Sequence, residues 1–110
     1  MKQIALTVNL RDDPDVIATY RKYHAGVWPV VLDGLKSVGV ADMRIYGLGR
    51  RLFMIASVSD EFDPATDFKR YLDFDPRCLE WEDLMGAMQE AVPESKSDGK
   101  WAEMELYFSM

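Results

Sequence analysis

The sequence of 110 residues has little cysteine, a single histidine and fewer basic than acidic side chains. Its one cysteine, Cys78, can form no intrachain disulfide and no cysteine cluster that holds zinc, so we expect a small buried residue there. A formal net charge of -6 argues against a nucleic-acid partner, because such binding rests mostly on neutralising phosphates. No apolar run approaches the roughly 18 residues of a membrane span, so we expect a cytoplasmic protein with no membrane partner.

The pattern of hydrophobic residues and Asp-Pro pairs predicts where strands and helices begin. Ile4, Leu6 and Val8 alternate with the residues between them, which indicates a strand. Aspartate favours the capping position of a helix, and proline suits its first helical position. Three such pairs are Asp13-Pro14, Asp63-Pro64 and Asp75-Pro76. Each pair predicts the start of a helix.

The length fits one domain over residues 1–110, because domains commonly run to about 100–150 residues. Pro29 predicts a break near residues 27–28, and Gly39 is placed to end the helical piece that follows. The predicted segments are a strand at 3–9, helices from about 14 and over 30–38, strands at 42–48 and 52–59, helices at 64–72 and 76–91, a polar loop at 94–100 and a strand at 101–108. This β-α-β-β-α-β order predicts an α+β fold, a ferredoxin-like sandwich of the dimeric α/β barrel type.

One face of the predicted sheet lacks a helix to cover it, yet it carries apolar side chains. In the predicted last strand, Met104, Leu106 and Phe108 share one side, while Trp101 and Tyr107 lie on the other. An exposed apolar patch of this kind marks an interface or a ligand site, and two-fold pairs are the commonest oligomers. We therefore expect a homodimer that packs sheet against sheet.

His24 is the first candidate for proton chemistry, because the unperturbed pKa of histidine, about 6.5, suits proton transfer near neutral pH. Tyr20, His24 and Trp28 follow one another at intervals of four residues, so a continuous helix would place them on one face. Three flat side chains with polar atoms in one stripe favour a pocket. A histidine on an apolar stripe is also commonly a core residue, so both interpretations stand at this point.

Two further clusters carry groups of interest. Trp81 belongs to an apolar stripe of the predicted helix over 76–91, a pattern more typical of a core than of a binding site. Glu103 and Glu105 share one face of the predicted last strand, either as solvated surface residues or as the acid–base partner that His24 lacks nearby. No glycine-rich phosphate loop, nucleophile elbow or second zinc ligand is present, so we expect no metal.

Four segments stand in a particular order and spacing along nearly the whole chain. They are Tyr20, His24 and Trp28-Pro29 at intervals of four, then Asp42-Met43-Arg44-Ile45-Tyr46, Leu52-Phe53-Met54 and Cys78-Leu79-Glu80-Trp81. With these segments the sequence resembles the L-rhamnose mutarotase family. The resemblance implies a homodimer that interconverts the α and β anomers of a 6-deoxy-L-sugar, a monosaccharide, without a cofactor. It also implies that His24 is the proton donor and that Tyr20 and Trp81 contact the sugar.

The sequence departs from the pattern of this family at two expected sugar contacts. Met43 stands where the rhamnose enzymes carry a tyrosine, and Glu82 stands where they carry the second tryptophan of a pair. A carboxylate at 82 can accept hydrogen bonds from hydroxyls, and members that resemble L-fucose mutarotases also carry this Trp-Glu pair. We therefore expect L-fucose as the favoured substrate, with L-rhamnose next. The expected sugar-binding residues are Trp28, Met43, Tyr46, Trp81 and Glu82.

Two alternatives from other functional classes remain open at the level of the sequence. One is a haem-degrading or quinone-forming monooxygenase of the dimeric α+β barrel type, which shares the predicted topology and can use a lone helical histidine. The other is a dimeric effector-binding module without catalytic activity. Haem binding would favour the first alternative, and sugar binding without faster anomer exchange would favour the second.

Overall fold

The computed structural model describes residues 1–95 and 100–110. Its strands and helices follow one another in nearly the predicted order. They are β1 (Lys2–Leu10), α1 (Pro14–His24), α2 (Pro29–Ser37), β2 (Val40–Leu48), β3 (Arg51–Val58), α3 (Pro64–Tyr71), α4 (Pro76–Met88), β4 (Gln89–Glu90) and β5 (Ala102–Met104).

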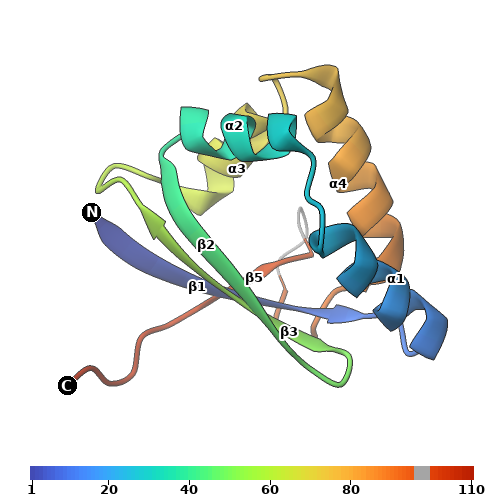
Figure 1. Cartoon of the computed structure of the whole chain (residues 1–110). Helices are drawn as coiled ribbons and strands as arrows, with labels where there is room; N and C mark the ends of the chain where they lie inside the picture. Colours follow the sequence, from blue (N-terminus) through green and yellow to red (C-terminus); the bar gives the residue numbers. More distant parts are fainter. Residues whose placement is uncertain (96–99) are drawn as a thin grey trace.

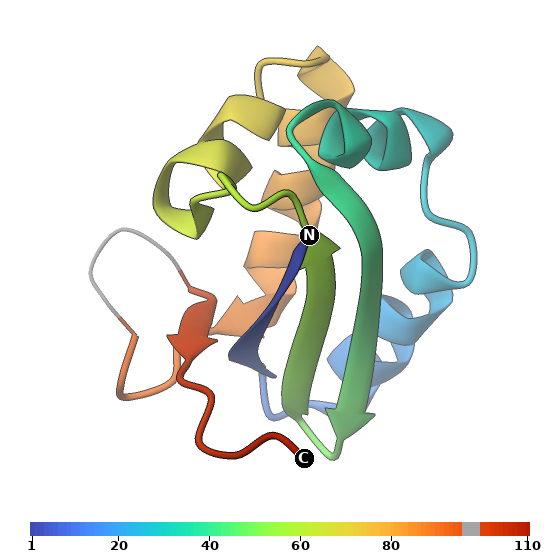
Figure 2. The ribbon, with the colours of Figure 1, turned by 90° about the vertical axis from the view of Figure 1, so that its left-hand side faces the viewer.

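The strands form one antiparallel sheet in the order β2-β3-β1, and both β4 and β5 pair with the other edge of β1. β1 and β2 run antiparallel to the strand between them, β3, so they are parallel to each other. Figures 1 and 2 show α1 to α4 on one side of this sheet. The fold is the predicted ferredoxin-like α+β sandwich, a split βαβ arrangement.

The three Asp-Pro pairs begin helices α1, α3 and α4, as predicted. In each pair the aspartate carboxylate accepts a hydrogen bond from the backbone N–H two residues on, which satisfies one of the free donors in the first turn. The distances are 2.9 Å from Asp15 N to Asp13, 3.0 Å from Ala65 N to Asp63 and 2.9 Å from Arg77 N to Asp75. The helix starts therefore follow from local sequence.

The helical segment after β1 breaks where Pro29 predicts it. α1 ends at His24, residues 25–28 are not helical, and α2 begins at Pro29. At the end of α2, Gly39 has a φ of +107°, and a Cβ there would lie 2.7 Å from the Ser59 hydroxyl oxygen. Gly39 thus ends the helix as predicted, because only glycine adopts this conformation readily.

The predictions for the C-terminal part are wrong in two places. The last strand is not 101–108 but the three residues of β5, and residues 105–110 have no regular structure and exposed side chains. The helix predicted over 76–91 ends at Met88, because Gln89–Glu90 pairs with β1 as β4. β4 and β5 thus share one edge of β1, which limits the length of each of them. The predicted polar loop at 94–100 includes residues 96–99, which lie outside the described residues.

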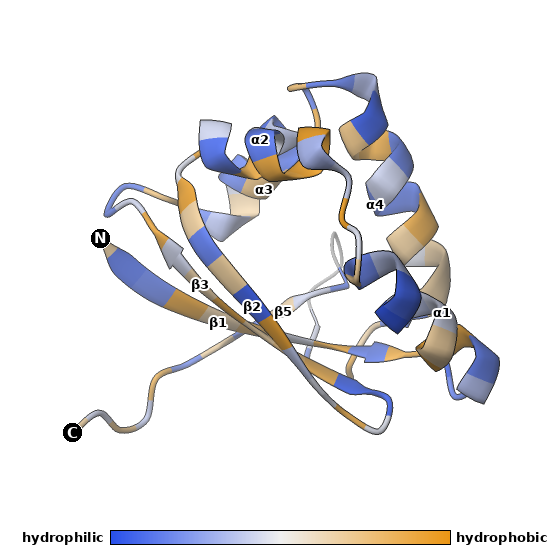
Figure 3. Cartoon of the chain, in the orientation of Figure 1, coloured by the Kyte–Doolittle hydropathy of each residue, from blue (hydrophilic) through white to orange (hydrophobic). Residues whose placement is uncertain are grey.

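Alternate residues of the strands form two different faces, which we call the covered face and the uncovered face. The covered face meets the helices and is made of Ile4, Leu6, Val8, Leu10, Met43, Ile45, Leu52, Met54, Ala56 and Val58. The uncovered face is made of Ala5, Thr7, Arg44, Tyr46, Leu48, Phe53, Ile55, Ser57, Ala102 and Met104. Figure 3 shows the hydrophobic residues along the strands and helices. The core lies between the covered face and the helices.

The structure bears on two further expectations, the burial of Cys78 and the lack of a membrane span. Cys78 is fully buried in α4, and its thiol lies 3.7 Å from the carbonyl oxygen of Val30. None of the helices described for this chain is both long and apolar enough to cross a membrane.

Candidate active site

α1 presents Tyr20 and His24 one helical turn apart, and their rings stack with centroids 4.3 Å apart at an interplanar angle of 26°. Tyr20 is buried, and its hydroxyl accepts a hydrogen bond from Nε2 of Gln89 at 3.4 Å. Burial raises the pKa of the Tyr20 phenol to about 12, against the smaller opposing effect of this hydrogen bond. The phenol therefore stays protonated at neutral pH and can donate to a ligand.

The His24 imidazole is oriented by the backbone of its own helix. Nδ1 lies 2.9 Å from the carbonyl oxygen of Tyr20. A carbonyl can only accept, so Nδ1 carries the proton and donates, and Nε2 of the neutral ring keeps its lone pair. Burial lowers the pKa of His24, while the hydrogen bond to the carbonyl acts weakly in the opposite direction. The neutral ring, with Nε2 as proton acceptor, is thus the favoured form at neutral pH.

Trp81, on α4, brings the aromatic residues of three segments together. Its ring meets His24 edge to face at a centroid distance of 5.4 Å, Trp28 at 5.1 Å and Tyr23 at 6.0 Å. Trp28 lies beyond the end of α1, in the non-helical segment between α1 and α2. It therefore does not reach this cluster along one continuous helical face. Trp81 is buried, and such edge-to-face contacts are preferred aromatic geometries.

A cleft of about 580 Å³ opens beside Tyr20 and His24. It is lined by Leu10, Ile17, Tyr20, Arg21, His24, Ile45, Gly47, Gly49 and Leu52. The cleft therefore lies between α1 and the covered face of the sheet, and its size falls in the range of about 300–1,000 Å³ that is usual for small-molecule sites. A hollow of about 440 Å³ on α4 contains none of the predicted site residues.

Glu82 follows Trp81 on α4 and is only partly accessible to solvent. Burial raises the pKa of its carboxyl, and an interaction with the Tyr71 hydroxyl opposes this effect. The Tyr71 hydroxyl is buried, and no hydrogen bond of standard geometry is described for it among the residues that the structure covers. The negative charge of Glu82 also contributes to the raised pKa of Tyr20. Glu82 therefore belongs to the same electrostatic neighbourhood as the cleft.

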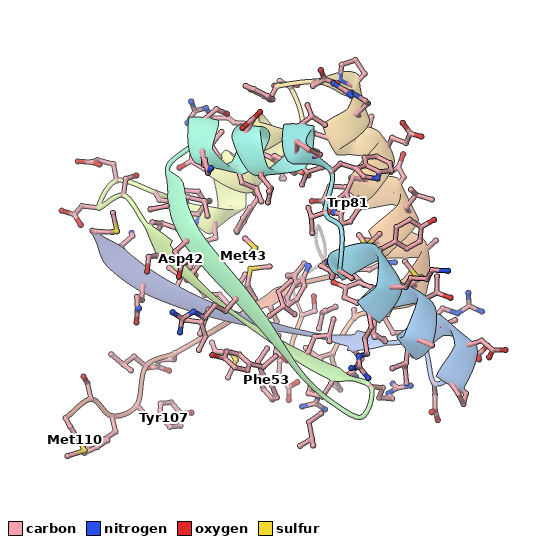
Figure 4. The ribbon with its side chains drawn as sticks, viewed as in Figure 1. Asp42, Met43, Phe53, Trp81, Tyr107 and Met110 are labelled. Carbon is pink, nitrogen blue, oxygen red and sulfur yellow. The ribbon has the colours of Figure 1, made fainter. Side chains whose placement is uncertain are left out.

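The remaining predicted sugar contacts, Met43 and Tyr46, lie on opposite faces of the sheet. Met43 is partly buried on the covered face. Figure 4 shows both Met43 and Trp81 in the space between the sheet and the helices. Tyr46 pairs with Phe53 on the uncovered face and is 53% exposed. The structure thus does not bring Tyr46 to the His24 cluster, because residues three apart on a regular strand point to opposite faces.

The two candidate acid–base partners of His24 are exposed. Glu103 lies on β5, where its register partner is Leu6, and Glu105 follows the end of that strand. Among the interactions described for residues 1–95 and 100–110, neither carboxylate contacts Tyr20, His24 or Trp81. Their predicted role as acid–base partners of His24 therefore stays a prediction.

Two residues that the sequence analysis did not single out contribute to this neighbourhood. Gln89 donates to the Tyr20 hydroxyl from the strand that follows α4, and Tyr71 approaches Glu82 from the end of α3. A glutamine at a helix end and a tyrosine in a polar helix carry no local signal of function. Only the long-range contacts, 69 residues apart for Gln89 and Tyr20, reveal them.

Within the described ranges, no group of three or more His, Cys, Asp and Glu side chains is placed to hold a metal ion. The candidate site is thus made of stacked aromatic rings, one imidazole, one phenol and a partly buried carboxyl.

The fold resembles that of known α+β domains over its whole length. An L-rhamnose mutarotase structure from Formosa agariphila has a TM-score of 0.70 at 21% sequence identity, covering 100% of this chain and 99% of that one. Tetracenomycin F2 cyclase of Streptomyces glaucescens, a type-II polyketide cyclase, has a TM-score of 0.55 at 12% identity, with the same coverage. These likenesses show the class of fold, a ferredoxin-like α+β domain.

The family follows from the sequence comparisons. The sequence profile of L-rhamnose mutarotase matches residues 3–110. An L-fucose mutarotase of Xanthomonas campestris pv. campestris is 36% identical over 112 residues, covering 100% of this chain and 89% of the relative. A UPF0734 protein of Dictyostelium discoideum is 35% identical, covering 99% of this chain and 90% of its own length. The chain belongs to the L-rhamnose mutarotase family, as its resemblance predicted.

Proposed function

We propose that this protein interconverts the α and β anomers of a 6-deoxy-L-sugar, with L-fucose favoured and L-rhamnose next. The observation that carries the proposal is the oriented His24 imidazole, which stacks on Tyr20 and borders a cleft of about 580 Å³. Membership of the L-rhamnose mutarotase family supports the reaction type. Glu82 and the 36% identical relative that is an L-fucose mutarotase support the order of preference between the two sugars.

Mutarotation needs two proton transfers at the anomeric centre. In ring opening, Nε2 of neutral His24 takes the proton of the anomeric hydroxyl, and C1 forms its double bond to that oxygen. The C1–O5 bond breaks with its electron pair on O5, which takes a proton from a second carrier. The aldehyde turns about C1–C2, and closure on the other face reverses each transfer. In this proposal His24 is thus the base of ring opening and the proton donor of ring closure, whereas the family resemblance implies a proton donor.

The second proton carrier is a water molecule in this proposal. Glu103 and Glu105 are the carboxylates that we predict as alternatives, and both are exposed on or beyond β5. Each step moves only protons and electron pairs within the sugar, so neither a metal nor a cofactor is needed to balance the reaction.

The sugar contacts follow from the polar and flat side chains near His24. The Tyr20 phenol stays protonated and donates to a sugar hydroxyl, since burial raises its pKa to about 12. For the C–H face of the ring we propose contact with Trp28 and Trp81, whose rings pack edge to face, and for the sugar hydroxyls hydrogen bonds to Glu82. Met43, which is partly buried on the covered face of the sheet, is a further proposed contact of the sugar.

We further propose that the protein is a homodimer that buries its uncovered face. This face exposes Tyr46, Ile55 and Met104, which a partner of the same kind can cover. Beyond β5, the side chains of Leu106, Tyr107 and Phe108 are exposed and apolar, and Figure 4 shows Tyr107 and Met110 away from the body of the subunit. A second copy supplies the surface against which these residues pack.

Saturation-transfer NMR of anomer exchange on L-fucose, L-rhamnose and D-ribose tests the reaction. Wild-type protein is expected to accelerate exchange of L-fucose most. His24→Ala is expected to lose about 10²–10⁴-fold in rate, the usual contribution of a positioned acid–base group. The exposed neighbour Lys22 provides the matched control Lys22→Ala, which should keep the rate. No acceleration with any of the three sugars, or a folded His24→Ala variant at full rate, contradicts the proposal.

A further inference from the structure

Gln89 is a buried amide at the junction of α4 and the sheet. It is 8% exposed, and its Nε2 donates to the hydroxyl oxygen of Tyr20 at 3.4 Å across 69 residues of sequence. Burying an amide costs free energy unless it forms hydrogen bonds, and an apolar pair of the same shape would fill this space without that cost. Packing alone therefore gives no reason for this pair of polar groups.

The backbone around Gln89 is fixed by contacts with β1 and with Lys100. Gln89 pairs with Leu10 where β4 joins the edge of β1. One residue earlier, the carbonyl oxygen of Met88 accepts a hydrogen bond from the backbone N–H of Arg11 at 2.9 Å. The ammonium of Lys100 donates to the carbonyl oxygen of Gln89 at 3.2 Å. The side chain of Gln89 thus extends from a backbone that has little freedom to move.

This backbone places the amide on the side of the sheet where the cleft lies. Leu10, the register partner of Gln89, lines the cleft, and residues directly opposite each other in an antiparallel pair extend their side chains to the same face. Tyr20 also lines the cleft, whereas Gln89 is not among the lining residues in the described part of the chain. Gln89 therefore acts on a ligand in the cleft through this phenol and not by direct contact.

The direction of the hydrogen bond decides what the phenol can do. A tyrosine hydroxyl has a single proton to donate and lone pairs with which to accept. Since its oxygen accepts from Gln89, the proton of Tyr20 stays available for a group in the cleft. The distance of 3.4 Å exceeds the usual range of about 2.7–3.2 Å, as is common for hydrogen bonds of free enzymes that tighten when the ligand binds.

We propose that Gln89 is a positioning residue of the sugar site, whose side-chain amide donates to the Tyr20 hydroxyl and turns the proton of this phenol toward a sugar hydroxyl in the cleft. The inference rests on the proposed mutarotase function, in which Tyr20 binds the sugar. The His24 ring keeps its own orientation without Gln89, because its hydrogen bond goes to the backbone carbonyl of Tyr20. Loss of the amide should therefore appear in KM and not in kcat.

Gln89→Met tests the proposal, because methionine has a similar length and no N–H donor in its side chain. For L-fucose we expect KM to rise about tenfold with kcat within about twofold, since a binding hydrogen bond is misdirected. Gln3→Met makes the same exchange at an exposed position of β1 and should leave both constants unchanged. Saturation-transfer NMR over a range of L-fucose concentrations gives both constants, and melting followed by circular dichroism checks that each variant is folded.

A double-mutant cycle with Tyr20→Phe separates positioning from a purely structural effect. If Gln89 acts through the Tyr20 hydroxyl, Gln89→Met should change KM by less than about twofold once that hydroxyl is absent. Equal increases in KM with and without the hydroxyl would refute the positioning role.

Gln89→Glu keeps the size of the side chain and reverses the hydrogen bond, so it tests the same point without a change of shape. Above neutral pH an ionised carboxylate can only accept, and it takes the proton of Tyr20 away from the cleft. We expect KM for L-fucose to rise at least as much as in Gln89→Met. A folded Gln89→Glu variant with the wild-type KM would overturn the inference, because shape and not the donor would then matter.

The outcomes for this inference and for the proposed function are distinct. If wild-type protein exchanges L-fucose anomers while folded Gln89→Met keeps the wild-type KM, the role of Gln89 is refuted and the mutarotase function stands. If wild-type protein accelerates the exchange of none of the tested sugars, the proposed function fails, and the inference that rests on it fails as well.

Discussion

The covered and the uncovered face of the sheet are built by alternate residues of the same strands, but they meet different surroundings. On the covered face, Val8, Ala56 and Val58 are completely buried by the helices. On the uncovered face, Ile55 is 40% exposed and Leu48 is 78% exposed. The groups with shifted pKa values near the proposed site, Tyr20, His24, Tyr71 and Glu82, all belong to the helices on the covered side.

This difference shows how one hydrophobic pattern serves two purposes. Period-two alternation places apolar side chains on both faces, but burial follows only where another element packs. Desolvation then shifts the pKa values of polar groups on that side, which is the condition for proton chemistry. The uncovered face keeps its apolar surface available for association.

The largest expected effect comes from truncating a residue that packs on the covered side. Trp81→Ala should lower the free energy of unfolding by about 3–5 kcal/mol, because it removes the contacts with His24, Trp28 and Tyr23. Urea denaturation followed by circular dichroism measures the change. Leu79→Ala, on the exposed side of the same helix, should cost about 0.5 kcal/mol or less. Equal losses for the two variants would mean that α4 packs differently.

A charge on the uncovered face tests the predicted dimer. Ile55→Glu should weaken association at least tenfold, or about 1.4 kcal/mol, because a charged group is costly to bury in an apolar interface. Sedimentation velocity over a range of protein concentrations measures this change. Leu79→Glu adds the same charge to the outer side of α4 and should leave association unchanged. A wild-type chain that sediments as a monomer at all concentrations would contradict the dimer.

A pH series compares a carboxyl on the covered side with one on the uncovered side. Burial raises the pKa of Glu82 above its ordinary 4.5, so the folded state favours the protonated form. The stability from this shift is present below pH 4.5 and is lost as pH rises through the folded-state pKa. Glu82→Gln should therefore raise the melting temperature at pH 7 relative to wild type, and the difference should vanish in acid.

Asp42, an exposed carboxylate near the start of β2, supplies the control for this series. Asp42→Asn should shift the melting temperature little at any pH, because an exposed ion pair contributes about 0–1 kcal/mol. If Glu82→Gln and Asp42→Asn behave alike at pH 7, Glu82 is not desolvated in the folded protein.

Much of the fold could be predicted because its signals are local. The Asp-Pro pairs determine three helix starts through hydrogen bonds that span two residues, and Pro29 determines the break after α1. The last strand could not be predicted in the same way. Its alternation continues to Phe108, but only Ala102–Met104 pairs with β1, and pairing depends on a remote strand edge.

The sequence by itself determined the stack of Tyr20 on His24, because residues four apart on a helix are neighbours whatever the rest of the chain does. Only the tertiary structure decided that Trp81 closes on this pair from α4, that Tyr71 faces Glu82, and that Tyr46 lies on the other side of the sheet. These relations join segments far apart in the chain. They depend on how the helices pack on one face of the sheet, which local spacing does not encode.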